Sequence, residues 1–309
     1  MLDMSWERYV PLLKLTIEEI KHIFLEFDRG IEIIGFEAIQ LGCKNSNFAV
    51  TTSKGRFLLR ITCPGSFSNE KIAYELVKGK INVPSLLFHT VKQQRNIFIY
   101  QYLEGVSLQK HMIEKNRCSE TLLEQAAKGA ALIHSIAKDE TVNLAQWDVP
   151  PYEMWYEIFL DHPLVRARIG EELREKIQRL VFDKHDWIEE IDRCKSFIHC
   201  DFRPVNMIVD RKNRLFFVDW ESACWGHFLA DIGAFFRFRS YFNEANIRLF
   251  EKTYHFFANH KLPDHWVELS LFRDLVNPLQ LLASNQEAPK RNADLIHVVK
   301  ETLDDWGYL

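Results

Sequence analysis

The sequence has few of the features that mark nucleic-acid-binding, membrane-spanning or disulfide-stabilised proteins. Its 39 Lys and Arg residues are outnumbered by 43 Asp and Glu residues, so the basic excess typical of duplex-binding proteins is missing. No stretch approaches the roughly 18 consecutive apolar residues that a membrane-spanning helix needs. The six cysteines are scattered and form no CxxC pair, which argues for reduced thiols rather than a zinc ribbon or a disulfide framework.

The N-terminus and the small content of Gly and Pro exclude further classes. The first ten residues, MLDMSWERYV, contain acidic side chains and no apolar core, so they do not predict a secretory signal. Only 12 Gly and 10 Pro accompany 47% apolar and 27% charged residues, which excludes disordered and fibrous proteins. The 309 residues predict a cytoplasmic globular protein of about two domains or lobes, which binds neither nucleic acid nor a membrane.

The first third of the chain predicts a sheet that follows a helical segment. Apolar side chains three and four residues apart over residues 6–28 predict helices. Short β-branched or aromatic runs begin near residue 32, and Lys54-Gly55 fits a hairpin turn between two of them. Residues 69–80 predict a helix with Asn69 as its N-cap.

Helical patterns dominate beyond residue 104, with one interruption. Residues 197–220, FIHCDFRPVNMIVDRKNRLFFVDW, predict a short hairpin around Lys212-Asn213 among amphipathic helices. Strands first and helices later predict an α+β protein with two segregated lobes that meet near residue 104.

The interrupting segment holds four polar residues at a specific spacing. His199, Asp201, Asn206 and Asp219 follow the order H-x-D-x4-N-x12-D. This pattern resembles the catalytic loop and metal-binding strand of the protein-kinase-like superfamily, and most closely its aminoglycoside phosphotransferase and choline kinase branch. The complete pattern, with an apolar strand on each side of the hairpin, is far more specific than an isolated H-x-D.

The resemblance implies a fold and a reaction. The fold is a two-lobed protein-kinase-like one, with a nucleotide-binding lobe at 1–104 that includes a helical extension over about 1–30. A larger helical lobe at 105–309 carries the catalytic loop and binds the acceptor. The reaction is Mg²⁺-dependent transfer of the γ-phosphate of ATP to a hydroxyl of a small molecule, such as an aminoglycoside-like, amino-alcohol or sugar-like acceptor. GTP stays open as the donor.

The resemblance also assigns roles around the catalytic loop. Phosphoryl transfer depends mainly on positioning and charge neutralisation. Asp201 would accept a hydrogen bond from the acceptor hydroxyl and serve as base late in the transfer. Asn206 and Asp219 are the expected Mg²⁺ ligands, because Mg²⁺ prefers hard oxygen atoms, and Glu221 on the same predicted strand could touch a second ion. His199 is expected to hold the loop rather than take part in the chemistry.

The nucleotide lobe carries weaker parts of the same pattern. Arg60, in GRFLLRI, stands where the branch has a Lys or Arg that bridges the nucleotide phosphates and a helix glutamate. Glu70 is the expected glutamate, with Glu75 as the alternative. Residues 41–47 resemble the phosphate-covering loop, and residues 97–108 resemble the hinge that binds adenine. The expected nucleotide contacts in the loop and hinge are Gly42, Asn45, Ser46, Asn47, Gln101, Tyr102 and Leu103.

Two residues outside the loop are expected to support it, and one residue departs from the family pattern. Asp231 resembles the carboxylate that hydrogen-bonds the catalytic loop, and His134 is expected to be a buried core histidine. Cys200 replaces the usual glycine, so backbone strain is expected there. A thiol-protease pair of His199 and Cys200 is disfavoured, because adjacent residues on a strand point to opposite faces.

The sequence does not identify the acceptor, and two other functional classes stay open. One is a kinase-like binding or structural module without turnover, as in some spore-coat relatives. The other, a protein kinase, is disfavoured because no D-F-G or A-P-E follows Asp219. A monomer or homodimer is expected. The candidate acceptor contacts are Trp147, Asp148, Tyr152, Glu153, Tyr156, Glu157, Arg237, Arg239, Tyr241, Asp274 and Asn277.

Overall fold

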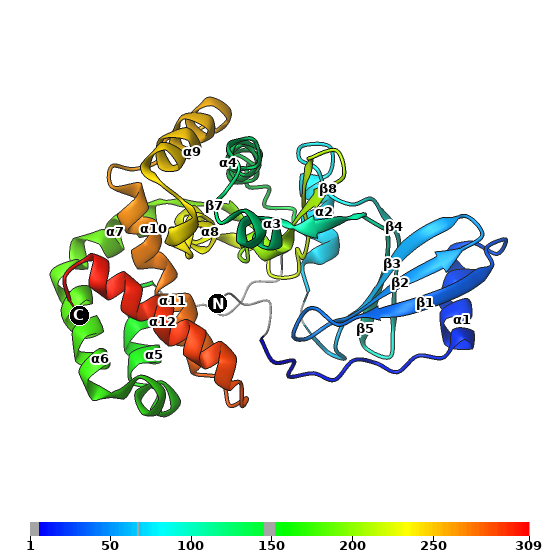
Figure 1. The fold of residues 1–309 in the computed structure, drawn as a ribbon, viewed down its shortest axis with the longest axis horizontal. Coiled ribbons are helices and arrows are strands. Elements are labelled where there is room, and N and C mark those ends of the chain that lie inside the picture. The colour runs from blue at the N-terminus through cyan, green and yellow to red at the C-terminus, as the bar shows by residue number, and fades with distance from the viewer. Residues whose placement is uncertain (1–5, 67, 145–151, 309) are drawn as a thin grey trace.

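The protein has an antiparallel sheet in its N-terminal part and a mainly helical C-terminal part (Figure 1). The computed structural model describes residues 6–66, 68–144 and 152–308, with the backbone alone at 152 and 153. The five-stranded sheet has the order β1-β2-β3-β5-β4 with antiparallel neighbours, and this mixed α+β architecture confirms the predicted fold class. The elements of this part are α1 (Ile17–Phe27), β1 (Ile33–Ile39), β2 (Ser46–Thr52), β3 (Gly55–Ile61), α2 (Glu70–Val77), β4 (Leu86–Lys92) and β5 (Arg95–Gln101).

One face of the sheet packs against α1. Phe24 of α1 is fully buried with Phe48 of β2 and Leu59 of β3 in one apolar cluster. The helix begins at a capping box, in which the Thr16 side chain accepts from the Glu19 N–H and the Glu19 carboxylate accepts from the Thr16 N–H. This cluster fixes α1 on one face of the sheet.

The C-terminal part combines helices with two small sheets. Strand β8 pairs with both β6 and β9, which confirms the hairpin predicted around Lys212-Asn213, and β7 pairs with β10. No helix in the described ranges is both long and apolar enough to cross a bilayer. The elements are β6 (Gly105–Ser107), α3 (Leu108–Lys115), α4 (Glu120–His134), α5 (Tyr152–Leu160), α6 (Pro163–Asp183), α7 (His185–Arg193), β7 (Lys195–Ile198), η1 (Pro204–Asn206), β8 (Met207–Asp210), β9 (Leu215–Phe217), β10 (Cys224–His227), α8 (Phe228–Phe236), η2 (Arg239–Tyr241), α9 (Glu244–Phe257), α10 (Trp266–Asp274), α11 (Val276–Leu282) and α12 (Pro289–Asp305).

Helix α8 lies at the centre of the helical part, with every residue buried. Gly233 allows it to approach α10 so closely that a Cβ there would lie 2.1 Å from the backbone oxygen of Ser270. Asp231 is on the same helix. The close contact between α8 and α10 therefore fixes the position of Asp231 beneath the loop that follows β7.

The helical prediction is wrong over residues 6–15, where tertiary contacts compete with helix formation. These residues form no helix, and the N–H groups of Tyr9 and Val10 donate instead to the backbone oxygen of Cys43 (3.2 Å each). Asn69 is the N-cap residue of α2 as predicted, but its side chain makes no capping hydrogen bond and donates to the backbone oxygen of Ala223 (2.8 Å). We call residues 6–10 the strap; Figure 1 shows the chain passing from beside α12 along the sheet to α1.

Candidate active site

Arg60 of β3 lies among three carboxylates from distant parts of the chain. Its Nε is 3.0 Å from Glu70 Oε2 at the start of α2. Its Nη2 is 2.5 Å from Asp219 Oδ1 and 3.3 Å from Glu221 Oε2. Arg60 is only 7% exposed, and its pair with Glu70 is the most shielded of the three, whereas Asp219 keeps part of its carboxylate in contact with water. The structure therefore brings together the cation and the acidic residues that the sequence singled out.

Glu70, rather than Glu75, is the helix glutamate that pairs with Arg60. Glu75 lies on the exposed side of α2 and pairs with Lys78. The Tyr100 hydroxyl donates to Glu70 Oε1 (2.8 Å), and burial raises the pKa of Glu70 to about 7 against the lowering effect of Arg60. The sequence did not predict the role of Tyr100. The pairing of β3 with β5 brings Tyr100 near Glu70, and such a pairing leaves no local pattern in the sequence.

Asp219 and Glu221 reach Arg60 from a loop, not from the predicted strand. Strand β9 ends at Phe217, and Asp219 adopts a left-handed backbone with φ 70°. Glu221 Oε2 also accepts a hydrogen bond from Asn45 Nδ2 (2.6 Å), which joins the loop after β9 to the loop before β2. A left-handed non-glycine residue costs about 1–2 kcal/mol, and such strain typically persists at functional sites.

Asp201 is held between Asn206 and Arg203 in the loop after β7. Asn206 Nδ2 donates to Asp201 Oδ2 (2.6 Å), and Arg203 donates to both carboxylate oxygens, with Nη2 2.9 Å from Oδ2. Burial alone would raise the pKa of Asp201, but the Arg203 charge lowers it to about 2. Asp201 is therefore ionised at neutral pH and can accept a hydrogen bond. Sequence reasoning missed Arg203, although a cation two residues beyond an aspartate in one loop was a usable signal.

Asp231 holds this loop through the backbone, which confirms its expected contact. Its Oδ2 accepts from the His199 N–H (2.7 Å) and its Oδ1 from the Cys200 N–H (2.8 Å). His134 is buried as expected and lies 3.2 Å from Asp231 Oδ2 through Nε2. The His199 ring bonds through Nε2 to the backbone oxygen of Val218 (3.0 Å), and so links the catalytic loop to the residue before Asp219.

Cys200 keeps the backbone conformation of the glycine that it replaces. Its φ is 64°, in the left-handed region that favours glycine. A hydrogen bond to the Cys224 thiol raises the pKa of the Cys200 thiol well above its ordinary value. The thiol therefore stays neutral at physiological pH, which argues independently against a nucleophilic cysteine.

The loop between β1 and β2 contains buried amide oxygens without a partner and a hydroxyl that braces the chain before α1. Gly42 has φ 95°, a conformation that needs glycine. Asn45 and Asn47 each bury an Oδ1 atom that has no hydrogen-bond partner in the part of the chain that the structure describes. Ser46 Oγ accepts from the Leu13 N–H (3.0 Å), so this hydroxyl anchors the chain before α1.

The expected hinge connects β5 to β6. The Gln101 N–H donates to the backbone oxygen of Ser85 (2.9 Å), so this N–H already has a partner within the protein. The Arg56 guanidinium lies 4.2 Å from the ring centre of Tyr102, and Leu103 is partly buried. Adenine contacts from Gln101, Tyr102 and Leu103 stay a prediction.

The oxygen donors near Arg60 fit Mg²⁺ better than a softer metal. Asp219 and Glu221 offer carboxylates. Asn206 donates to Asp201 through Nδ2, which leaves the amide oxygen of Asn206 for an ion. Among the residues with described positions, no group of three or more His, Cys, Asp or Glu side chains forms a metal cluster. This donor set fits an ion that also takes nucleotide phosphates and water.

Two of the residues proposed as acceptor contacts form a buried ion pair. Arg237 donates through Nε and Nη2 to the two carboxylate oxygens of Asp274 (2.7 Å each), and Asn277 Nδ2 donates to Asp274 as well (2.9 Å). The Tyr156 hydroxyl instead donates to the backbone oxygen of Phe272 (2.8 Å). Trp147 and Asp148, and the side chains of Tyr152 and Glu153, lie outside the described residues.

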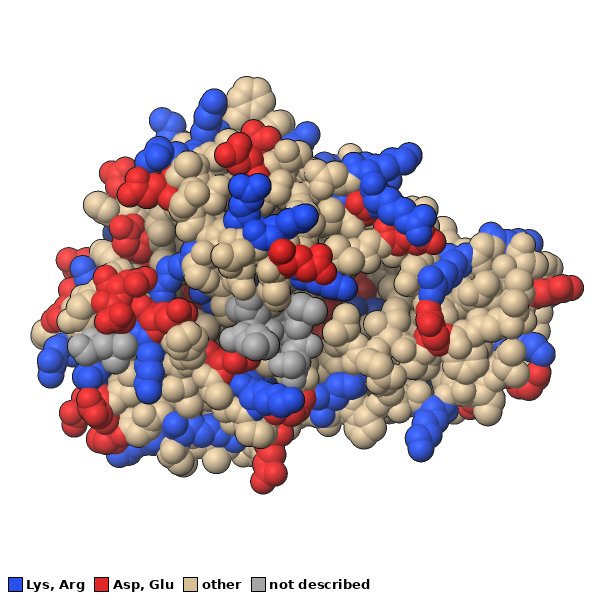
Figure 2. Space-filling model, in the orientation of Figure 1, with Lys and Arg blue, Asp and Glu red and all other residues tan. Residues whose placement is uncertain are grey.

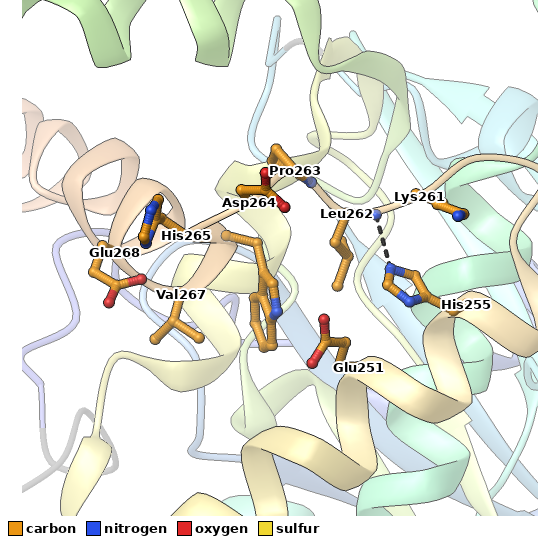
Figure 3. Close-up of a pocket in the computed structure, with 10 residues that line it drawn as sticks. Glu251, His255, Lys261, Leu262, Pro263, Asp264, His265, Val267 and Glu268 are labelled. Carbon is orange, nitrogen blue, oxygen red and sulfur yellow. Dashed lines mark hydrogen bonds between the residues drawn. The ribbon is translucent and has the colours of Figure 1, made fainter.

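Charged side chains of both signs surround the hollow between the two parts of the molecule (Figure 2). A separate hollow of about 490 Å³ lies between the end of α9 and the start of α10 (Figure 3). In that hollow His255 Nε2 accepts from the Leu262 N–H (3.0 Å). None of its lining residues belongs to the constellation around Asp201 and Asp219, so we do not assign it to the active site.

Comparisons with known proteins identify a relative, a shared fold and a family. A curated relative, "Protein LicA homolog" of Mycoplasma capricolum subsp. capricolum, is 26% identical over 159 residues, which are 51% of this chain and 56% of the relative. The chain thus spans about half the length of that relative.

Solved structures share the fold over nearly the whole chain. Spectinomycin phosphotransferase APH(9)-Ia, in complex with ADP and spectinomycin, has a TM-score of 0.71 at 12% identity, covering 96% of this chain and 99% of that one. Choline kinase LicA from Streptococcus pneumoniae has a TM-score of 0.68 at 17% identity, covering 93% and 99%. At these identities the likeness establishes the fold alone.

A family model described as "Phosphotransferase enzyme family" (APH) matches residues 35–265. The match runs from β1 to the end of the loop before α10, and so contains the loop before β2, the catalytic loop and Asp231. Because it covers well over half of the 309 residues, the chain belongs to the Phosphotransferase enzyme family.

Proposed function

We propose that the protein is a small-molecule kinase that uses Mg²⁺ and transfers the γ-phosphate of ATP, or of GTP, to a hydroxyl group. The observation that carries the proposal is the pairing of an ionised Asp201 with Asn206 beside the Arg60–Asp219 contact. The Val218 N–H donates to the backbone oxygen of Asn206 (3.0 Å), which holds the two halves of this constellation together. Related structures hold ADP, AMP-PNP or AMP, which supports a nucleotide as the donor.

Asp201 positions the acceptor. Its ionised carboxylate accepts a hydrogen bond from the acceptor hydroxyl and receives the proton as the new P–O bond forms. Asn206 fixes the carboxylate through Nδ2, and Asp231 fixes the backbone on which Asp201 stands. Because phosphoryl transfer gains little from covalent help, this orientation supplies a large part of the rate enhancement.

Arg60 and the carboxylates around it prepare the nucleotide side. Arg60 would contact the nucleotide phosphates while Glu70 holds the guanidinium in place. Asp219 and the amide oxygen of Asn206, with Glu221 nearby, would hold the metal. Bound Mg²⁺ would neutralise charge on the phosphates. The unpartnered amide oxygens of Asn45 and Asn47 would accept hydrogen bonds from the nucleotide beneath the loop.

The test is turnover with a panel of hydroxylated small molecules, measured as ADP release from ATP. We expect at least one panel member to be phosphorylated. Asp201→Ala should lower kcat by about 10²–10⁴-fold while Mg-ATP binding is kept. Asp304→Ala on the exposed face of α12 is the matched control and should leave kcat unchanged.

Two results would overturn the proposal. One is an Asp201→Ala variant that turns over as fast as the wild type. The other is a wild-type protein that binds Mg-ATP but phosphorylates no acceptor, which would favour the kinase-like binding module instead.

A further inference from the structure

The strap is hydrogen-bonded to the loop between β1 and β2 by one side chain and two backbone groups. The Arg8 guanidinium donates to the backbone oxygens of Gly42 and Asn45, the second at 2.8 Å. The N–H groups of the next two residues of the strap both donate to the backbone oxygen of Cys43 (3.2 Å each). Three carbonyl groups of this loop are therefore held on the side of the strap.

The orientation of this loop decides whether it can bind phosphates. Carbonyl oxygens carry partial negative charge and repel a phosphate, whereas backbone N–H groups attract it. The N–H groups of Gly42, Lys44 and Asn45 donate to no backbone oxygen in the part of the chain that the structure describes. Asn45 Nδ2 donates to Glu221 Oε2 (2.6 Å), so the loop is also attached to the carboxylates around the expected metal site. By holding the carbonyl groups, Arg8 leaves the N–H groups of the loop for a nucleotide.

The other end of the strap is fixed to the helical part. The Glu7 carboxylate accepts from the N–H groups of Lys290 (2.9 Å) and Arg291 (3.3 Å), in the first turn of α12. The first N–H groups of a helix have no partner within it, and Ala288, the N-cap residue of α12, has no side chain that could cap them. Glu7 therefore caps α12 from the far end of the chain, and its negative charge suits the helix dipole there.

Trp6 connects the same end of the strap to the catalytic loop. Its Nε1 donates to Asp294 Oδ2 (2.9 Å), one turn further along α12. Its ring centre lies 5.6 Å from the Arg203 guanidinium, which donates to Asp201. The strap therefore contacts the loop before β2, the catalytic loop and α12. It links the two parts of the molecule in addition to the hinge.

We propose that the strap acts as a clamp that positions the loop between β1 and β2 for phosphoryl transfer. Arg8 orients this loop over the nucleotide phosphates, and Glu7 and Trp6 set its place relative to the catalytic loop. This inference rests on the proposed function, to whose nucleotide site it adds Arg8 as a positioning residue. A loop that is held in its binding conformation beforehand loses less conformational entropy when the nucleotide binds, so the clamp raises the affinity.

Nucleotide affinity tests the role of Arg8. A non-hydrolysable ATP analogue with Mg²⁺ is titrated calorimetrically into the wild type, Arg8→Met, Arg8→Lys and Arg29→Met. Arg29→Met removes the same charge from an exposed turn between α1 and β1 and is the matched control. We expect an affinity at least about tenfold lower in Arg8→Met and an unchanged affinity in the control.

Arg8→Lys separates position from charge. A lysine keeps the attraction of a cation for phosphates but lacks the planar fork that donates to two carbonyl groups at once. We therefore expect Arg8→Lys to bind the analogue nearly as weakly as Arg8→Met. Wild-type affinity in Arg8→Met would overturn the inference. Wild-type affinity in Arg8→Lys would overturn it too, because the charge alone would then be sufficient.

The clamp also predicts an effect of its distant anchor. Glu7→Ala removes the contact with α12 and should lower the affinity for the analogue, although the Glu7 carboxylate bonds to the helical part. The double variant Glu7→Ala/Arg8→Met should bind as Arg8→Met does, because both substitutions disable one strap. Losses that add in full in the double variant would overturn the inference.

Amide hydrogen exchange gives a second readout, which the stability of a variant does not decide. In the wild type the analogue should slow exchange at the N–H groups of Lys290 and Arg291, because a bound nucleotide holds the loop and, through it, the strap on α12. In Arg8→Met this slowing should be absent. Exchange at these two N–H groups that does not respond to the analogue in the wild type would overturn the inference.

Turnover distinguishes this inference from the proposed function. Arg8→Met should raise the KM for ATP more than it lowers kcat, because Arg8 acts on nucleotide binding through the loop. Phosphorylation of an acceptor with the same KM for ATP in Arg8→Met and the wild type would overturn the inference and keep the proposed function. Arg8-dependent binding of the analogue without turnover of any acceptor would do the reverse.

Discussion

At the scale of single residues, the site depends on the neighbours of Asp201 as much as on Asp201 itself. Burial opposes ionisation of this carboxylate, and Arg203 outweighs burial. The Arg203 guanidinium also lies 5.6 Å from the ring centre of Trp6 in the strap. One arginine therefore links the charge state of the expected base to the strap.

Arg203→Met should raise the pKa of Asp201, because burial remains while the largest lowering effect is lost. In the wild type a carboxyl with a pKa of about 2 stays ionised through the assay range, so kcat should show no acidic loss from Asp201 above about pH 5. In the variant, kcat should fall as the pH decreases through the raised pKa. The measurement is kcat against pH.

Arg203→Lys is the control for this prediction, because it keeps the positive charge but loses the two-pronged contact, and it should give a profile between those of Arg203→Met and the wild type. An Arg203→Met profile with the same shape as that of the wild type would show that Arg203 does not set the ionisation of Asp201.

At the scale of elements, α8 positions the catalytic loop through the Asp231 carboxylate. Its Asp231 receives two N–H groups from the loop, and Gly233 lets the helix pack against the backbone of α10. A change at Gly233 should therefore affect both the free energy of unfolding and the geometry of Asp201.

Gly233→Ala would place a Cβ 2.1 Å from the backbone oxygen of Ser270, which cannot move aside as a flexible side chain would. We expect a loss of about 1–3 kcal/mol in the free energy of unfolding, together with a lower kcat. Gly35→Ala is the matched control, because an added Cβ there meets no atom within 4 Å. Denaturant unfolding of both variants checks this, and equal stability of the two would contradict the packing argument.

The elements also show which parts of the fold local sequence can predict. Strands β2 and β3 and the β8–β9 hairpin were predicted because alternation and turn residues act over a few positions. The helical prediction for residues 6–28 was wrong over residues 6–15, because the N–H groups of Tyr9 and Val10 donate to the backbone oxygen of Cys43 in the loop before β2. Apolar spacing predicts a helix only where no distant partner takes its backbone groups.

At the scale of the whole molecule, the site exists because distant segments meet. Arg60 and Asp219 are 159 residues apart, and Asn45 and Glu221 are 176 apart. No local pattern predicts such contacts, and the sequence indicated them only through the spacing shared with a known family. The sequence offered no prediction for three features, namely Arg203, Tyr100 and the strap, because none of them belongs to the family pattern.

The proposed function divides the site into two groups of residues with separable tasks. The constellation around Arg60 and Asp219 would hold the nucleotide and its metal, whereas Asp201 would act on the acceptor. Substitutions on the two sides should therefore affect different measurements, one the affinity for Mg-nucleotide and the other the rate of transfer.

The most direct test of this division is calorimetric titration of a non-hydrolysable ATP analogue, with and without Mg²⁺, into the wild type, Asp201→Ala and Asp219→Ala. We predict Mg²⁺-dependent binding to the wild type and nearly equal affinity in Asp201→Ala. Asp219→Ala should bind at least about tenfold more weakly, because it loses the carboxylate that faces both Arg60 and the metal. Unchanged affinity in Asp219→Ala, or an equal loss in Asp201→Ala, would contradict the account.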